Sequence, residues 1–260
     1  MELYNTYNPA DKKAAGLFIG RVFMYMFIGI LITTVIAVGM GLGFTQWIFG
    51  TLNVSEAYAL DELSVFDVNK EAATTLLTLL IISGISLIIL AFVISFFFLK
   101  GNHNLLIPSV LYASLMGVTM SSFVIFVPWS ILGTAFGITT LIFGVMTAIA
   151  FLSKGSLNFL GVIGIGLFLG SALLGLIGFF LYLGGASEAF MTLYWIVSFM
   201  SFAAILFITI WDLWRLKQIA LRGEHSTNLA LYCAFTLYVD FIYILIRMIY
   251  FLLQIYGRNK

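Results

Sequence analysis

Seven long apolar stretches constrain this chain more than any other feature of its sequence. They cover Val22–Phe44, Thr74–Leu99, Leu105–Val127, Ile131–Leu152, Phe159–Leu183, Met191–Trp211 and Leu229–Leu253. An α-helix of about 20 apolar residues is long enough to cross the hydrocarbon core of a bilayer. The runs are continuous and lack the in/out alternation of a membrane β-barrel. We therefore expect an all-α integral membrane protein with seven transmembrane helices.

The composition also indicates that the protein lies in a lipid bilayer, which is the first partner we expect. Hydrophobic residues make up 62% of the 260 residues and charged residues only 9%, too few charges to cover the surface of a soluble domain. The net charge of +1 provides no basic surface for nucleic acid. One cysteine and two histidines exclude a disulfide framework and a Cys- or His-based metal cluster. No bound cofactor is expected.

The positive charges between the spans indicate the orientation. With the N-terminus inside, eight lysines and arginines lie on the inner side and three on the outer side, as the positive-inside rule requires. We expect a cytoplasmic N-terminal tail over residues 1–21, a transmembrane domain over 22–255 and a C-terminal tail over 256–260. The first span lacks a cleavage pattern and is interpreted as retained. Short loops favour a bacterial plasma membrane, and a monomer is expected.

Glycines are frequent in the fourth and fifth spans. Small residues recur four positions apart at Gly133 and Gly137, at Gly166 and Gly170, and at Ser171 and Gly175. In lipid such pairs allow two helix backbones to approach closely. Tight helix packing is therefore expected at these positions.

Charges inside the spans are the candidates for function, because each costs on the order of 3 kcal/mol at a helix centre. Asp240 and Arg247 lie in the middle of the seventh span, and Asp212 ends the apolar run of the sixth. The apolar pattern continues to Leu221, which puts Asp212 about 14 Å and Asp240 about 20 Å from the bend between these helices. The two carboxylates are expected at similar depth.

A polar stripe follows the seventh span. Its members, three and four residues apart, are Cys233, Thr236, Asp240, Tyr243, Arg247, Tyr250 and Gln254. This spacing puts them on one helical face, and a face that carries charges should meet protein or a wet path rather than lipid. The seventh helix is therefore expected at the centre, with six helices around it.

Asp212 and Asp240 are the predicted pH sensor. Two carboxylates in a water-poor interior cannot both ionise cheaply, so they are expected to titrate as a pair. Deprotonated, they offer oxygen ligands for Ca²⁺, but two carboxylates cannot fill its shell of about six to eight oxygens, so transient binding fits better than storage. A structural alternative stays open: Asp212 could pair with Arg215 along one helix edge, and Asp240 could bond only to nearby hydroxyl groups.

The same residues carry a resemblance to the Bax inhibitor (YccA-like, transmembrane Bax inhibitor motif) family. Ile210-Trp211-Asp212-Leu213 with Leu216–Ile219 resembles the family's Tyr-Asp-Leu…Gln-Ile stretch, and Leu237–Ile242 is similar to its Leu-Tyr-Leu-Asp-Phe-Ile segment. The resemblance implies six helices around a central C-terminal one and a pH-sensitive Ca²⁺ leak governed by two aspartates, which match Asp212 and Asp240. Ca²⁺ and protons would be its ligands.

The resemblance also implies other roles and a latch. Eukaryotic members restrain cell death and some bacterial members modulate a membrane protease, so the alternative is a regulatory membrane protein that binds such a partner. Bacterial relatives latch the first aspartate with an arginine near the end of the second span. Here Lys100 is the nearest cation, Arg215 or Arg247 could substitute for it, and Tyr243 and Thr236 are candidates for the pathway.

An enzyme is not expected. Two membrane aspartates suggest an intramembrane aspartyl protease, but its Gly-x-Gly-Asp motif is absent, since Tyr238-Val239-Asp240 contains no glycine. Gly-x-Ser-x-Gly, His-Glu-x-x-His and a Gly-rich phosphate loop are also absent.

Overall fold

The structure, a computed structural model, describes residues 9–49, 70–100, 104–185, 187–223 and 225–258. Over these residues it is all-α, without a strand. The helices are α1 (Pro9–Phe49), α3 (Lys70–Lys100), α4 (Leu106–Phe126), α5 (Trp129–Leu152), α6 (Asn158–Leu183), α7 (Ser187–Leu221) and α8 (Thr227–Arg258). All seven are long and apolar enough to cross a membrane. The prediction of an all-α membrane protein with seven spans is confirmed.

Several helices extend beyond the predicted apolar runs. α1 begins at Pro9 and α8 continues to Arg258, so helix reaches into both predicted tails. Lysine, alanine and glutamine are good helix formers, and a helix need not end where its apolar run ends. α7 runs to Leu221, as the apolar pattern predicted. Gly223 follows with φ 83°, a left-handed conformation that glycine adopts without strain after a helix.

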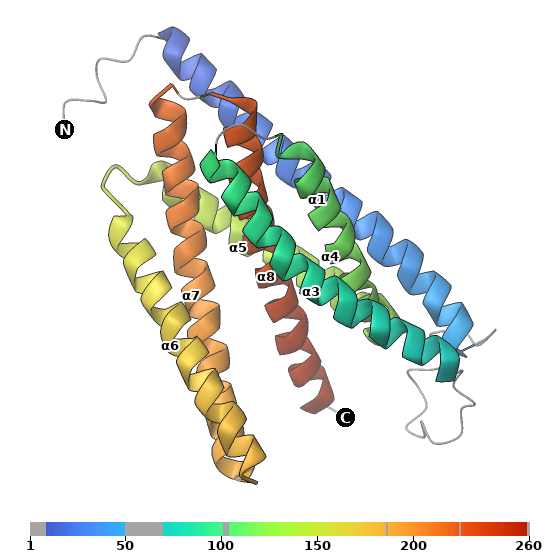
Figure 1. Cartoon of the computed structure of the whole chain (residues 1–260). Coiled ribbons are helices and arrows are strands. Elements are labelled where there is room, and N and C mark those ends of the chain that lie inside the picture. The colour runs from blue at the N-terminus through green and yellow to red at the C-terminus, as the bar shows by residue number, and fades with distance from the viewer. Residues whose placement is uncertain (1–8, 50–69, 101–103, 186, 224, 259–260) are drawn as a thin grey trace. The chain divides into compact units, whose positions relative to one another are not determined.

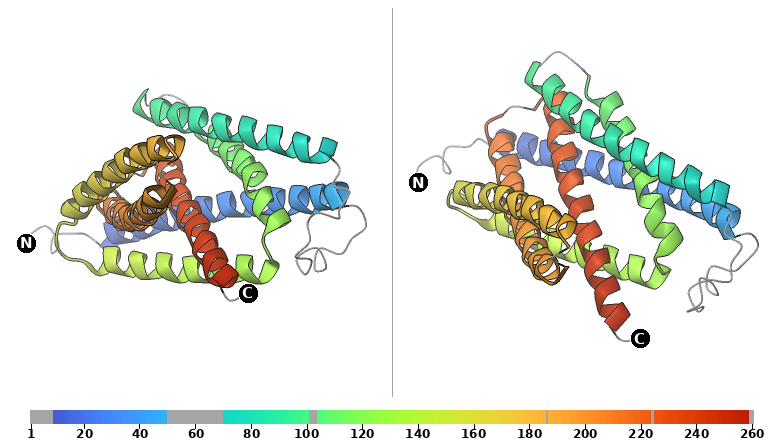
Figure 2. Two further views of the ribbon diagram at one scale, coloured as in Figure 1. Left: turned by 90° about the horizontal axis from the view of Figure 1, so that it is seen from below. Right: turned by 60° about the horizontal axis from the view of Figure 1, so that its bottom comes forward.

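The helices fall into two compact units, which are described separately. The first unit contains α1 up to Ile19, α5 from Ala135, α6, α7, and α8 from Val239. Within it, α6 and α7 run side by side and antiparallel (Figures 1 and 2). Phe241 of α8 packs edge-on against Phe136 and Phe143 of α5, with ring centroids 5.8 and 5.7 Å apart. α8 thus contributes directly to the core of this unit.

The second unit contains the rest of α1, α3, α4, the start of α5 and α8 up to Tyr238. α3 and α4 pack as neighbours, and the Ser83 and Thr119 hydroxyls bond across them at 3.0 Å. Thr33 of α1 donates to the Ala113 carbonyl of α4 at 2.9 Å and also bonds the Tyr238 hydroxyl at 2.6 Å. Buried hydroxyl bonds of this kind join helices in an apolar solvent.

α8 belongs to both units and is the most buried helix. In its most apolar window 56% of the residues are buried, against 39% or less in the other six helices. Its N-terminal half packs with α3 and α4 through Tyr232 and Phe235, and its C-terminal half packs with α5 and α7. The arrangement of six helices around α8 stays a prediction.

The glycine prediction was wrong in part. A Cβ on Gly133, Gly137 or Gly166 would meet nothing within 4 Å, so these residues do not lie at close helix contacts. The close contacts between α6 and α7 lie at Gly161, at Gly164 and at the predicted Gly170, where a Cβ would lie 2.8 Å from Met200 Cε. A spacing of four residues places two glycines on one face, but it does not tell which face meets a neighbour.

Candidate functional site

Asp240 lies on the buried side of α8, with 4% of its surface exposed. Its carboxyl group forms a side-chain hydrogen bond with the Thr209 hydroxyl of α7. The second carboxyl oxygen, Oδ2, is buried and has no hydrogen-bond partner in the described part of the chain. A buried polar atom without a partner costs about 1–3 kcal/mol, so such an atom is rare unless a ligand, a water or a proton serves it.

Asp212 lies three residues after Thr209 on α7 and is half-buried. Its carboxyl group interacts electrostatically with that of Asp240 and with the guanidinium of Arg215. The structure therefore places the two predicted aspartates within electrostatic range of each other, and Arg215 within electrostatic range of Asp212. Arg215 is exposed, and its guanidinium lies 5.3 Å from the centroid of the Trp211 ring.

The two aspartates differ in how far they are exposed. Asp212 is partly open to the surroundings and carries a nearby positive charge, whereas Asp240 is enclosed and has a hydroxyl neighbour. Within the described residues, no group of three or more His, Cys, Asp or Glu side chains could hold a metal ion. The two carboxylates and Thr209 supply oxygen atoms, but fewer than a full Ca²⁺ shell requires.

Arg247 is the other charge of α8 near α7. It donates from Nη1 to the Ser198 hydroxyl at 3.1 Å and from Nη2 to the Ser201 hydroxyl. Both serines are buried and belong to α7. The described contacts of Arg247 thus lead to hydroxyl groups and not to Asp212 or Asp240.

A comparison with protein families decides what kind of chain this is. The family model described as "Inhibitor of apoptosis-promoting Bax1" matches residues 16–258. The chain belongs to this family. The resemblance seen in the sequence is thereby confirmed, and the match includes both aspartates. Searches of curated proteins and of solved structures gave no match.

The other predicted site residues of this Bax inhibitor family member are Thr236, Lys100 and Tyr243. Thr236 bonds within its own helix, to the Tyr232 carbonyl at 3.1 Å. Lys100 is the last residue of α3, and its side chain lies outside the described residues. Tyr243 follows Asp240 on α8 but is 42% exposed. The role of these three residues in a latch or path stays a prediction.

The polar stripe of α8 is only partly enclosed. Asp240 is buried and Arg247 partly buried, but Tyr243 and Tyr250 are 42% and 46% exposed. Exposure of these two tyrosines does not distinguish a wet path from lipid, so the expectation that the whole stripe faces protein or a wet path stays a prediction. An aromatic ring with one hydroxyl tolerates an apolar or interfacial environment that a charge does not.

Lys217 is a buried cation that the sequence interpretation missed in this family member. It is 7% exposed, and its Nζ donates to the carbonyl oxygens of Phe151 and Ser153 at 2.9 and 2.8 Å. These carbonyls lie at the C-terminal end of α5, where the helix dipole favours a cation. The spacing could have indicated this burial. Lys217 lies four residues after Leu213 and three before Ala220, so it shares a helical face with two residues that are fully buried.

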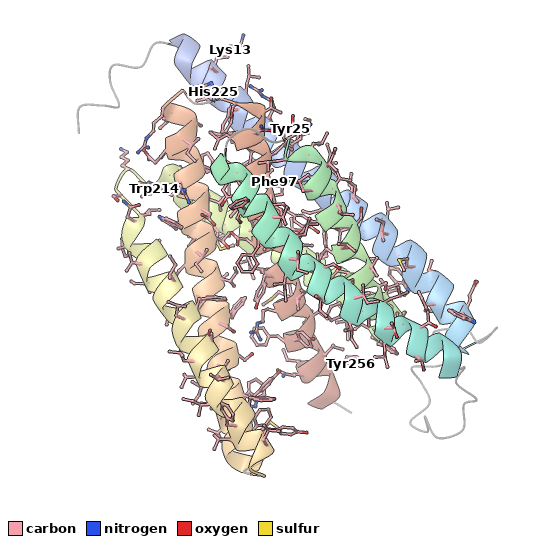
Figure 3. The ribbon with its side chains drawn as sticks, viewed as in Figure 1. Lys13, Tyr25, Phe97, Trp214, His225 and Tyr256 are labelled. Carbon is pink, nitrogen blue, oxygen red and sulfur yellow. The ribbon has the colours of Figure 1, made fainter. Side chains whose placement is uncertain are left out.

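The indole N–H of Trp214 is another buried polar group of α7. Trp214 lies on α7 two residues after Asp212 (Figure 3). Its indole N–H is buried and has no hydrogen-bond partner in the described part of the chain. Three polar features of α7, namely Thr209, Asp212 and Trp214, therefore lie within two helical turns.

Proposed function

We propose that this protein is a pH-sensitive cation leak, with Ca²⁺ as the transported ion, in which protonation of Asp212 and Asp240 controls the path. The observation that supports this most is the electrostatic interaction between a half-buried acid of α7 and an enclosed acid of α8. Paired acids inside a membrane-spanning bundle are costly, and where they occur they mark proton or ion pathways.

A proton on Asp240 gives its contact with Thr209 a clear donor. The Thr209 hydroxyl donates its single proton to the Ile205 carbonyl at 2.7 Å. While it does so, Thr209 can only accept from Asp240, and a carboxyl group donates only when it is protonated. A protonated Asp240 therefore satisfies both contacts of Thr209, and we assign it to the closed state.

Loss of that proton changes the forces at the acid pair. Thr209 can donate to the ionised Asp240 only by giving up the Ile205 carbonyl, and two like charges then repel each other across α7 and α8. A cation relieves this repulsion, because carboxylate oxygens are hard ligands that suit Ca²⁺. With fewer oxygens than a storage site has, the cation is released again, as a leak requires. Arg215 partly balances the charge on Asp212 and leaves Asp240 as the controlling group.

The test is Ca²⁺ flux into liposomes that contain the full chain and an enclosed Ca²⁺ dye, at two pH values. We expect pH-dependent flux in the wild type, and flux without pH dependence in Asp240→Asn and Asp212→Asn. Asp11→Asn makes the same chemical change near the start of α1 and should behave as the wild type. If Asp240→Asn and the wild type have equal flux at both pH values, the proposal is wrong.

A second proposal follows from the family description, which names inhibition of a cell-death protein. In this case the protein acts by binding a membrane protease or a cell-death partner. Co-purification from native membranes, with and without residues 1–8, tests it. A partner that binds Asp240→Asn as well as the wild type, in a protein without pH-dependent flux, would favour this role over the leak.

The location and the assembly complete the proposal. The protein acts as a monomer in a bacterial plasma membrane and catalyses no reaction. Membrane fractionation and the mass of the detergent-purified particle test the first two points. Cleavage of a model transmembrane substrate would contradict the third.

A further inference from the structure

The contact surface of α7 and α8 holds a second polar cluster, of opposite charge to the acid pair. It consists of Arg247, Ser198 and Ser201, and the two serines are 5% and 8% exposed. In the described part of the chain, no carboxylate forms an ion pair with Arg247, whose contacts are the two hydroxyls. A guanidinium stays protonated in proteins, so this cluster has a permanent positive charge.

The two clusters lie in sequence along the same pair of helices. Arg247 follows Asp240 by seven residues, which is two helical turns, or about 10 Å, on the same face. On α7 the serines precede Thr209 and Asp212, as antiparallel packing requires. Ile244 lies between Asp240 and Arg247 on that face and is fully buried. An apolar segment therefore separates the acids from the arginine.

The serines hold the arginine away from the acids. Two hydrogen bonds from different nitrogens orient the planar guanidinium. An arginine without such partners would extend toward the membrane surface or toward the nearest carboxylate. In the described arrangement Arg247 is thus fixed at the contact of α7 and α8 and bonds to neither Asp212 nor Asp240.

We propose that Arg247, positioned by Ser198 and Ser201, is an electrostatic barrier that sets the charge selectivity of the cation path. The inference rests on the proposed leak function. Coulomb repulsion from a fixed positive charge doubles from a monovalent to a divalent cation and is strong in a low-dielectric interior. The barrier therefore restrains Ca²⁺ more than K⁺ at every pH, whereas the acid pair controls the path as pH changes.

The experiment compares Ca²⁺ and K⁺ flux through the full chain in liposomes at two pH values. Arg247→Gln keeps a hydrogen-bond donor but removes the charge, and it should raise the ratio of Ca²⁺ to K⁺ flux by about tenfold. Arg247→Lys keeps the charge and should leave the ratio within about twofold of the wild type. If Arg247 only stabilised the packing of α7 and α8, the flux ratio would not depend on the charge at residue 247.

A second variant guards against a folding defect of Arg247→Gln. Ser201→Asp keeps Arg247 in place and neutralises it with an ion pair, so it should raise the ratio as Arg247→Gln does. Each variant is first checked for wild-type helix content and thermal unfolding. An unchanged flux ratio in Ser201→Asp, or equal ratios in Arg247→Gln and Arg247→Lys, overturns the inference.

The outcomes separate the inference from the proposed function. If Asp240→Asn abolishes pH dependence but the charge of residue 247 leaves the flux ratio unchanged, only the inference fails. If the wild type passes no cation, both fail. All variants that alter Arg247 or Ser201 should keep the pH dependence, because the acid pair is intact.

Discussion

Lys217 of α7 donates a hydrogen bond from Nζ to the carbonyl oxygen of Phe151, 2.9 Å away at the end of α5. Nζ also donates to the carbonyl oxygen of Ser153, which is 2.8 Å away and two residues further along the chain. A helix end in a protein interior leaves carbonyl groups that need donors, and a lysine is a suitable one because it also meets the negative end of the dipole. One side chain thus links α7, which carries Asp212, to α5.

Replacement of Lys217 by methionine should destabilise the protein. The change removes two charge-assisted hydrogen bonds and leaves two carbonyl groups unpaired, at a cost of about 2–4 kcal/mol. The measurement is the midpoint of thermal unfolding in detergent. Lys154→Met is the matched control, because Lys154 lies exposed beside the same helix end. Equal midpoints for the two variants would show that the Lys217 bonds contribute little.

The close contact of α6 and α7 predicts opposite effects for two neighbouring glycines. A Cβ on Gly164 would lie 2.8 Å from Ile208 Cγ1 and 3.1 Å from its backbone N, whereas a Cβ on Gly166 would meet nothing within 4 Å. Gly164→Ala should therefore lower stability by about 1–3 kcal/mol. Gly166→Ala should raise it by up to about 1 kcal/mol, because alanine is the better helix former.

These two glycine variants are compared by unfolding in the same detergent. Since both make the same chemical change in one helix, intrinsic helix propensity cancels between them. A Gly164→Ala protein as stable as Gly166→Ala would mean that α6 and α7 move apart at little cost.

Loss of the Thr33 hydroxyl should lower the stability of the second unit. Its hydroxyl donates to the Ala113 carbonyl, so in its bond with Tyr238 the tyrosine must be the donor. Thr33→Val keeps the shape but leaves the Tyr238 hydroxyl without its acceptor, at a cost of about 1–2 kcal/mol. Thr33→Ser keeps the hydroxyl and should lose less. The ranking is read from denaturant or thermal midpoints, and the reverse order would contradict it.

Replacement of Ile244 should change the cation flux but not its dependence on pH. It is fully buried and lies between Asp240 and Arg247 along α8, and on the proposed path an apolar side chain at this place would exclude water and ions. Ile244→Ser should raise cation flux in liposomes at both pH values, with its pH dependence kept. Ile255→Ser is the control, because Ile255 lies on the same helix and is 59% exposed. A flux equal to that of the control would show that Ile244 does not restrict the path.

Much of the fold could be predicted because each signal was local. A run of apolar residues is a property of one segment, and it forms a helix in lipid whatever its neighbours are. The extension of α7 to Leu221 could be predicted for the same reason. It allowed the depths of Asp212 and Asp240 to be counted from the bend, and the structure places their carboxyl groups within electrostatic range of each other.

The rest of the candidate site depended on which helix faces which. Arg247 was named from the sequence, but its bonds to Ser198 and Ser201 were not foreseen. Lys217 was counted only as an inner-side charge, although it is buried at the end of α5. Residues so far apart in the chain give no sequence signal of contact.

The sequence by itself determined the membrane environment, the seven helices and the family. It also singled out Asp212 and Asp240, because a charge in a membrane interior is costly. Helix formation and apolar burial in lipid need no distant partner, so these conclusions followed from the order of residues. Tertiary structure alone decided the rotation of each helix about its axis. That rotation made Gly164 a contact and Gly166 open, exposed Tyr243, and turned Arg247 toward serines, because packing between helices depends on both surfaces at once.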